Sequence, residues 1–379
     1  MAYAAATFAP SRLARQNSSN PRYGSILVVR LSAMGDIIHT LPAAALLRDA
    51  FPHATLGWLV EERWAELLCT LRYPRAGRRS PERPLVERVH TVNLREWRQA
   101  IFSFNTAQQV AVALSQLRGV AYDAVIDFQG AIRSALLARW SGATTAYGAT
   151  EPRENAASMF YTRKIETCGN HVVEQALSLA RTIIGTQENS GTCAASRGDL
   201  RDKLPIDPDA EKKVAAETAS VPDFAILNPG AGWGAKQWPA DRYGFVAKEL
   251  AKEGMRSLVN YGPGEETLAA AVEAASAGTA TKISCSIAEL ISLTRRARLM
   301  IGGDTGPMHL AAALQVPVVA IFGPTSPARN GPYGTRSIVL RSASSVTDHS
   351  RKRDPEEGLL EIVPAQVASA ARTLLRELM

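Results

Sequence analysis

The sequence has few cysteines, few aromatic residues and no long hydrophobic run. Of its 379 residues, 4 are cysteines and 6% are aromatic. No stretch approaches the roughly 20 apolar residues that a membrane-spanning helix requires, which argues against such a helix. Cys69, Cys168, Cys193 and Cys285 show no pairwise metal-ligand spacing and are too few for a disulfide scaffold. This usage fits a reducing compartment.

Residues 1–24 lack the features of an export signal. They are rich in alanine, but Pro10 and several arginines interrupt them. A signal peptide needs an uninterrupted run of about 7–15 apolar residues. We therefore expect residues 1–24 to be a disordered tail and the protein to be cytoplasmic.

Basic residues outnumber acidic ones. The chain has 43 Lys and Arg against 36 Asp and Glu, a formal charge of +7. This excess favours anionic partners such as phosphates, nucleic acid or a membrane face, although a merely solvated surface is an alternative. The arginines between positions 72 and 98 are not interleaved with aromatic residues as in single-strand binders, and no zinc-finger spacing is present. Nucleic acid is therefore not expected as a partner.

Short apolar runs alternate with helix-length segments. Several runs are continuously apolar, as expected of strands buried on both faces of a parallel sheet. The predicted strands are 26–30, 55–60, 124–128, 144–148, 224–228, 257–261, 298–302 and 316–322. The predicted helices are 35–50, 241–252, 265–277, 287–297 and 364–379. This alternation predicts an α/β protein with doubly wound sheets.

The polar segment 185–222 interrupts the alternation and marks a domain boundary. We expect two Rossmann-like domains that face each other across a cleft, spanning residues 25–195 and 210–363. The last helix, 364–379, is available to pack back across the interface. In open α/β sheets, ligands bind beyond the carboxyl ends of the strands. We therefore expect the chemistry-bearing residues to follow the ends of strands.

In the first domain, the strand that ends at Arg30 is followed by Gly35 and Asp36 at the start of a helix. The turn does not match the GxGxxG dinucleotide fingerprint. An acidic residue in a first helical turn is often only a dipole-compensating residue, which is the alternative to a catalytic role for Asp36.

In the second domain, a glycine-rich loop with Lys236 follows one strand, and Glu265 and Glu266 begin a helix after the next. A flexible loop with one cation suits a diphosphate, because lysine supplies a point charge and the backbone supplies donors. One of the two carboxylates could accept hydrogen bonds from the paired hydroxyls of a ribose. A surface lysine and a helix-start acid are the alternatives.

A later strand of the second domain ends in the run GGDTGPMH. Asp304, Thr305 and Gly306 open a helix that carries His309. Proline at the first helical position, preceded by glycine and small polar residues, leaves several N–H groups free to bind an anion. A buried core histidine is the alternative for His309.

Together, RLSAMGDIIHTLPA and GDTGPMHLAAALQVPVVAIFGPTSP resemble the ADP-heptose:lipopolysaccharide heptosyltransferases of glycosyltransferase family 9. The likeness spans residues 25–334 and is closest to the members that add the first heptose to the Kdo–lipid A acceptor. It implies a two-domain fold of the GT-B type, an inverting mechanism, and neither metal nor cofactor. Residues 1–24 and 343–358 lie outside it.

The resemblance also implies roles for individual residues. Asp36 matches the catalytic carboxylate, which accepts the proton of the acceptor hydroxyl. Lys236 matches the cation at the donor phosphates, and Glu266 matches the ribose carboxylate, with Glu265 as a one-residue alternative. Four residues match the donor-binding run of the family: Asp304, Thr305, Gly306 and His309. Three arginines match the cations that bind the acceptor: Arg95, Arg98 and Arg133.

The implied partners are ADP-heptose, a Kdo–lipid A acceptor and the cytoplasmic face of the inner membrane, which the protein would contact peripherally. The glycine content of the Lys236 loop and Cys285, where a methionine is expected, depart from the pattern and leave donor and acceptor open. Another nucleotide-sugar glycosyltransferase and a two-domain solute-binding protein are therefore alternatives. The sequence Asp207-Pro208-Asp209 resembles a metal–nucleotide motif, but it lies in the polar linker.

Overall fold

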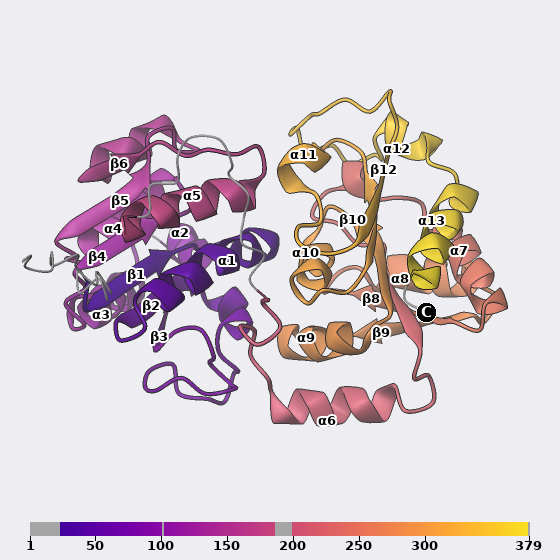
Figure 1. Ribbon diagram of the computed structural model, residues 1–379, viewed down its shortest axis with the longest axis horizontal. Coiled ribbons are helices and arrows are strands. Elements are labelled where there is room, and N and C mark those ends of the chain that lie inside the picture. Colours follow the sequence, from indigo (N-terminus) through magenta and orange to yellow (C-terminus); the bar gives the residue numbers. More distant parts are fainter. Residues whose placement is uncertain (1–22, 101, 186–198, 378–379) are drawn as a thin grey trace, which may run out of the picture.

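The computed structural model describes residues 23–100, 102–185 and 199–377, which form two α/β lobes (Figure 1). The first lobe contains one six-stranded sheet in the order β3-β2-β1-β4-β5-β6, and every pair of neighbouring strands is parallel. Its strands are β1 (Ser25–Val29), β2 (Thr55–Glu61), β3 (Arg88–Val92), β4 (Ala124–Asp127), β5 (Thr145–Ala149) and β6 (Arg163–Ile165).

The second lobe repeats this topology. Its sheet has the order β12-β11-β10-β7-β8-β9, again with parallel neighbours. Its strands are β7 (Phe224–Asn228), β8 (Arg256–Tyr261), β9 (Ala280–Ser284), β10 (Leu299–Gly303), β11 (Val318–Phe322) and β12 (Ser337–Arg341). In each sheet the strand order reverses beside the first strand, as in doubly wound nucleotide-binding folds. The predicted fold class is confirmed.

Helices cover both faces of each sheet. In the first lobe they are α1 (Met34–Ala50), α2 (Leu94–Gln99), α3 (Phe104–Arg118), α4 (Ile132–Trp140) and α5 (Val172–Ile184), with the short 3-10 helices η1 (Glu62–Leu67) and η2 (Asn155–Phe160). The connecting segment carries α6 (Pro208–Glu217), which packs on α9. In the second lobe they are η3 (Gly234–Lys236), α7 (Ala240–Lys252), α8 (Glu266–Ala275), α9 (Ile287–Arg296), α10 (Gly306–Ala313), α11 (Pro327–Asn330), α12 (Glu357–Glu361) and α13 (Pro364–Arg376).

The lobes meet through α1 and α10. A single hydrophobic cluster extends from the face of the first sheet under α1 to the face of the second sheet under α10. It contains Ile37 and Leu41 of α1 together with Met308 and Leu310 of α10, all of them buried. The start of α1, which carries Asp36, is therefore held directly against the start of α10.

The two ends of the described chain pack differently from what the sequence predicted. Helix α13 packs on α7 and on β10, β11 and β12, so it belongs to the second lobe and does not cross the interface. Residues 1–22 of the expected tail lie outside the described residues. Tyr23 and Gly24 belong to the first lobe, because Gly24 N donates to Asp123 Oδ2 at 2.8 Å and the Tyr23 ring packs on Phe51.

Two cysteines of the described residues are free thiols. Cys69 is buried and Cys285 is half-buried, and burial raises the pKa of the Cys285 thiol to about 12. Cys168 is disulfide-bonded, which was not expected from the sequence. Cys193 lies outside the described residues.

Candidate functional site

Asp36 lies in the first turn of α1, beyond the end of β1. Its Oδ2 accepts a hydrogen bond from Ala33 N at 3.1 Å, and its Oδ1 lies 2.8 Å from Arg30 Nη2. Arg30 is anchored in turn by a hydrogen bond from Nη1 to Phe128 O. The Asp36 side chain remains 36% exposed, so a carboxylate of fixed orientation faces the space between the lobes.

Asp127, a second carboxyl group at the end of β4, is fully engaged. It accepts hydrogen bonds from Ser134 Oγ at 2.9 Å, Tyr161 OH at 2.7 Å and Gln129 N at 2.9 Å. Burial raises the pKa of Asp127, although these hydrogen bonds oppose the rise. We interpret Asp127 as a structural residue that fastens the end of β4, because its lone pairs are already used.

Lys236 lies in η3, beyond the end of β7. Its Nζ lies 2.7 Å from Asp304 Oδ2 and 3.2 Å from Asp304 O, and 5.0 Å from the centre of the Trp233 ring. Burial alone would raise the pKa of Asp304, but the hydrogen bond from His309 and the charge of Lys236 lower it below its usual range. Asp304 is therefore an anion that orients Lys236.

Some of the residues that follow β10 lie at the cleft between the lobes, and others are buried at the interface where the lobes touch. Thr305 stands before α10, and its Oγ1 lies 3.3 Å from Asn228 Nδ2. A Cβ on Gly306 would lie 2.6 Å from Met34 Sδ of the first lobe, so this glycine permits close contact between the lobes. His309 is 5% exposed and also faces the first lobe. Gly306 and His309 thus lie at the interface, not on the cleft surface.

The two glutamates after β8 have different surroundings. Glu265 is half-buried, its Oε2 accepts from Gly262 N at 2.9 Å, and a Cβ on Gly230 of the Lys236 loop would overlap its carboxylate. Glu266 is exposed, and its Oε1 accepts from Gly264 N at 3.3 Å. The structure thus places Glu265, the alternative of the pair, beside the Lys236 loop.

The residues expected in the two binding regions surround common cavities between the lobes. Asp36, Lys236, Arg95, Arg98 and Arg133 all line one cavity of about 740 Å³. A neighbouring cavity of about 1200 Å³ is also lined by Asp36 and by residues of both lobes. The first cavity contains further cations that sequence reasoning did not single out: Arg63, Arg153 and Arg351.

Arg351 comes from the segment that lay outside the family resemblance. The segment is tied to the Lys236 loop by backbone hydrogen bonds from Ala235 N to Lys352 O at 3.1 Å and from Glu356 N to Ala235 O at 3.2 Å. The Arg351 guanidinium lies 5.7 Å from the centre of the Trp233 ring, on which Lys236 also lies. A signal for this placement existed only in the basic run Arg351 to Arg353.

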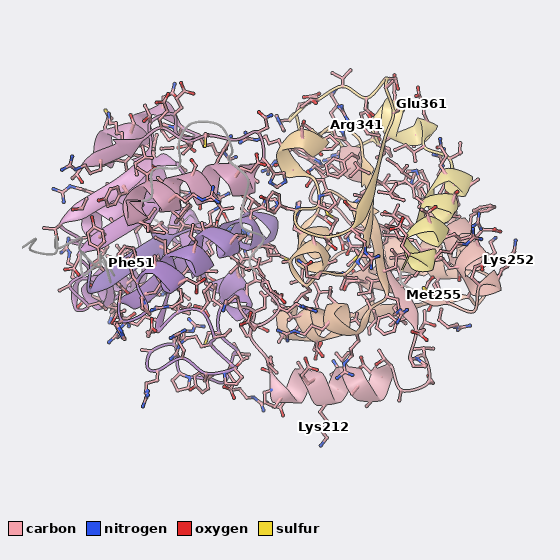
Figure 2. The ribbon with its side chains drawn as sticks, in the orientation of Figure 1. Phe51, Lys212, Lys252, Met255, Arg341 and Glu361 are labelled. Carbon is pink, nitrogen blue, oxygen red and sulfur yellow. The ribbon has the colours of Figure 1, made fainter. Side chains whose placement is uncertain are left out.

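Other basic residues lie far from the cleft. Figure 2 shows Lys212 on α6 and Lys252 at the end of α7 extending outward from the second lobe, and both are exposed. The Asp-x-Asp sequence is likewise structural. Asp207 caps α6 by accepting hydrogen bonds from the backbone of Asp209 and the next residue, and Asp209 pairs with Arg72 at 2.8 Å.

The described residues contain neither a cluster of metal ligands nor a membrane-spanning helix. Within 23–100, 102–185 and 199–377, no group of three or more His, Cys, Asp or Glu side chains is arranged to hold a metal ion. Over the same ranges, no helix has the length and apolar character needed to span a bilayer.

The sequence matches known heptosyltransferases over most of its length. The model of glycosyltransferase family 9 (heptosyltransferase) matches residues 111–360. Lipopolysaccharide heptosyltransferase 1 of Pseudomonas aeruginosa is 31% identical over 323 residues, which are 84% of this chain and 83% of that protein. The protein of the same name from Escherichia coli K12 is 29% identical over 84% of this chain and 93% of its own.

Solved structures agree with this assignment. The E. coli heptosyltransferase WaaC with ADP superposes with a TM-score of 0.72 at 26% identity, covering 92% of this chain and 99% of that one. The E. coli ADP-heptose heptosyltransferase II, at 20% identity and a TM-score of 0.69, shares the fold. These matches confirm the GT-B architecture. They also set aside the solute-binding alternative, because the matched proteins are transferases. The chain is a glycosyltransferase that belongs to family 9.

Proposed function

We propose that the protein transfers heptose from ADP-heptose to the Kdo–lipid A inner core of lipopolysaccharide. One observation carries this proposal. A carboxylate of the first lobe, Asp36, and a cation of the second lobe, Lys236, line the same cavity. A glycosyl transfer by direct displacement needs a base on the acceptor side and positive charge at the leaving diphosphate, and the two lobes supply one each.

The reaction is a single displacement. Asp36 accepts the proton of the acceptor hydroxyl while that oxygen forms a bond to the anomeric carbon of heptose. The bond between that carbon and the diphosphate oxygen breaks, and ADP departs with the bonding electrons. Because the nucleophile and the leaving group occupy opposite faces of the sugar, the anomeric configuration inverts. Arg30 and Ala33 N hold the Asp36 carboxylate in place.

Donor binding is assigned to the second lobe. Lys236 binds the diphosphate. Asp304, whose Oδ2 lies 2.7 Å from Lys236 Nζ, keeps the lysine oriented. Thr305 stands at the start of α10, whose free N–H groups favour an anion. Glu265, not Glu266, is assigned to the ribose hydroxyls, because its carboxylate lies against Gly230. No divalent ion is required when the lysine and the helix start carry the charge.

Acceptor binding is assigned to the arginines of the first lobe. Arg95, Arg98 and Arg133 line the cavity next to Asp36 and match the phosphates and carboxylates of a Kdo–lipid A molecule. The same region supports peripheral contact with the inner membrane. Phe102 and Phe104 follow Arg95 and Arg98 in the chain; Phe102 is fully exposed and Phe104 largely exposed. Arginines beside exposed aromatic rings suit an anionic lipid surface.

The test is release of ADP from ADP-heptose by the purified protein, with and without a Kdo–lipid A acceptor. We expect release that depends on the acceptor, together with an acceptor that gains the mass of one heptose. UDP- and GDP-linked sugars serve as competing donors. Faster turnover of one of these would contradict the assignment of ADP-heptose and favour another member of the same family.

A further inference from the structure

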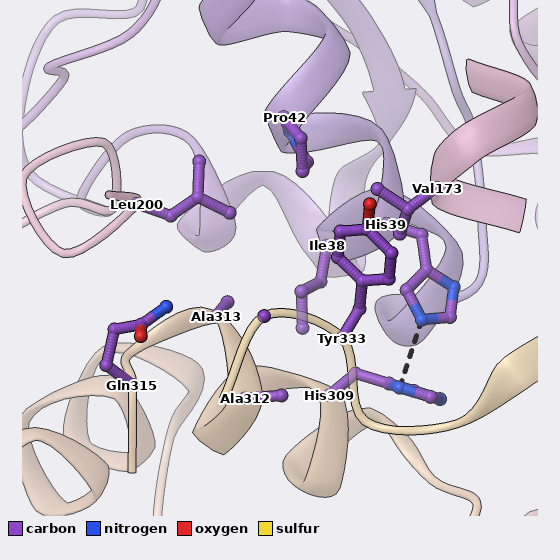
Figure 3. A pocket seen from close by; sticks show the side chains of 11 residues that line it. Ile38, His39, Pro42, Val173, Leu200, His309, Ala312, Ala313, Gln315 and Tyr333 are labelled. Atoms are coloured by element: carbon purple, nitrogen blue, oxygen red, sulfur yellow. Dashed lines mark hydrogen bonds between the residues drawn. The ribbon is translucent and has the colours of Figure 1, made fainter. Parts of the chain in front are cut away.

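A chain of hydrogen bonds crosses the interface between the lobes and ends at the donor lysine. It begins at His39 of α1, one helical turn after Asp36, whose Nε2 lies 3.0 Å from His309 Nδ1 of α10. His309 Nε2 lies 3.0 Å from Asp304 Oδ1, and Asp304 Oδ2 lies 2.7 Å from Lys236 Nζ. Figure 3 shows the contact between His39 and His309 as a dashed line across the gap between their helices.

The direction of each hydrogen bond follows from the anionic end of the chain. A carboxylate can only accept, so His309 Nε2 carries a proton and donates it to Asp304. The other ring nitrogen of His309, Nδ1, then accepts from the Nε2–H of His39. The remaining nitrogen of His39, Nδ1, is buried and has no hydrogen-bond partner among the described residues. That nitrogen is an unprotonated acceptor, so no buried N–H is left without a partner.

The surroundings of His39 keep its imidazole neutral. Burial lowers its pKa well below the ordinary value, and the nearby His309, His171 and Arg30 lower it further, while Asp304 opposes them. The ring is confined as well, because the His171 ring lies 5.5 Å away and the His309 ring 4.1 Å away. His39 therefore acts as a fixed, neutral hydrogen-bond donor.

The opposite tautomer of His309 would break the chain at both ends. A proton on Nδ1 would face the N–H of His39, and a lone pair on Nε2 would face the Asp304 carboxylate. His309 has little room to turn away, because a Cβ on Gly35 would lie 2.6 Å from its Cδ2. Asp304 thus sets the tautomer of His309, and His39 reinforces it by donating to the other ring nitrogen.

We propose that His39 is a positioning residue for heptosyl transfer, which fixes His309 and through Asp304 the orientation of Lys236. Asp36 and His39 lie on the same helix. The lobe that carries the base therefore also fixes the orientation of Lys236, the cation assigned to the leaving diphosphate. This inference rests on the proposed function for the role of Lys236. The chain of contacts itself does not depend on that function.

The decisive variants are His39→Leu, which removes the donor, and His39→Gln, whose amide nitrogen can reach the position of Nε2. For His39→Leu we expect kcat to fall about 10-fold, since one interaction with a charged network is lost and leaving-group charge develops in the transition state. The KM for ADP-heptose should change by less than about 3-fold, because most donor contacts remain. His39→Gln should recover most of the lost rate.

A matched control separates this role from general packing at the interface. Ile38 is the neighbouring buried residue of α1 and lines the same small interlobe pocket as Ala312 and Ala313 (Figure 3). Ile38→Ala loosens the interface but leaves the hydrogen-bond chain intact, so its kcat should stay near that of the wild type. An equal loss of kcat in Ile38→Ala and His39→Leu would overturn the proposal, as would failure of His39→Gln to recover activity.

Nitrogen NMR of the imidazole rings gives a readout that does not depend on turnover. In the wild type we expect His309 with its proton on Nε2, and in His39→Leu a changed Nδ1 resonance of His309, because that nitrogen loses its hydrogen-bond donor. An unchanged Nδ1 resonance of His309 in His39→Leu would overturn the inference even if activity fell. A wild-type protein that transfers no heptose would refute the proposed function, whereas an active wild type with an unaffected His39→Leu would refute only the role of His39.

Discussion

Lys236→Met removes a cation that has two roles in the structure. It neutralises Asp304 at 2.7 Å, and it is assigned to the departing diphosphate. The Lys236 side chain is 16% exposed and that of Asp304 8% exposed, so the substitution leaves a mostly buried anion with His309 alone. Breaking such a pair costs about 3 kcal/mol of stability. Loss of transition-state stabilisation should lower kcat by about 10²–10³-fold, or roughly 3–4 kcal/mol.

The double variant Lys236→Met/Asp304→Asn separates the two roles. It removes the unpaired anion, so the free energy of unfolding, measured in urea, should return toward that of the wild type. Its kcat for ADP release should remain as low as that of Lys236→Met, because no cation meets the leaving group. If the double variant regains the wild-type kcat, Lys236 serves only to neutralise Asp304, and the reasoning about the diphosphate is refuted.

Three further predictions concern metal, pH and the ribose contact. Transfer should survive EDTA, whereas complete loss that added Mg²⁺ restores would contradict a metal-free mechanism. Burial lowers the pKa of His90 to about 4. Since the unfolded chain binds this proton at a higher pH, stability should fall on acidification from about pH 7 to pH 5, with roughly 2 kcal/mol of the loss due to His90. His90→Phe should reduce that loss in urea unfolding, and an unchanged loss would refute the assignment. Glu265→Gln should raise the KM for ADP-heptose about 10-fold, and Glu266→Gln should leave it unchanged. The reverse pattern would assign the ribose hydroxyls to Glu266.

The inner strands of both sheets could be predicted from the sequence, and the outer strands could not. The eight predicted strands correspond to β1, β2, β4, β5, β7, β8, β10 and β11. The strands that were not predicted are β3, β6, β9 and β12, which form the four sheet edges. Strand β9 is mostly exposed or half-buried, and β12 has no buried residue. Edge strands face solvent on one side and so lack the continuous apolar run that marks a central strand.

The candidate site could be predicted where it depends on the ends of strands. Asp36 and Lys236 lie at the positions that sequence reasoning gave them, because a parallel sheet brings the carboxyl ends of its strands to one edge. The contact between His39 and His309 could not be predicted, since 270 positions separate them and only the docking of the lobes brings them together. Periodicity likewise could not decide between Glu265 and Glu266, because it does not fix the first residue of a helix.

The placement of the last helix shows a further limit. An amphipathic pattern predicts that α13 buries one face, but not which lobe supplies the covering surface. In the structure, Val367, Ala371 and Leu374 of α13 join the core cluster of the second sheet. The same limit applies to Arg351, whose segment reaches the cleft through backbone contacts with the Lys236 loop that no side-chain pattern signals.

The measurement that tests the central claim most directly compares wild type and Asp36→Asn for heptose transfer and for ADP binding. Asparagine keeps an oxygen that can accept from Ala33 N but cannot take a proton at neutral pH. The lost pairing with Arg30 is partly exposed and costs at most about 1 kcal/mol of stability. We predict that transfer falls by about 10²–10⁴-fold while ADP, which we assign to the other lobe, binds with unchanged Kd. Transfer by Asp36→Asn at a rate near that of the wild type would contradict the account.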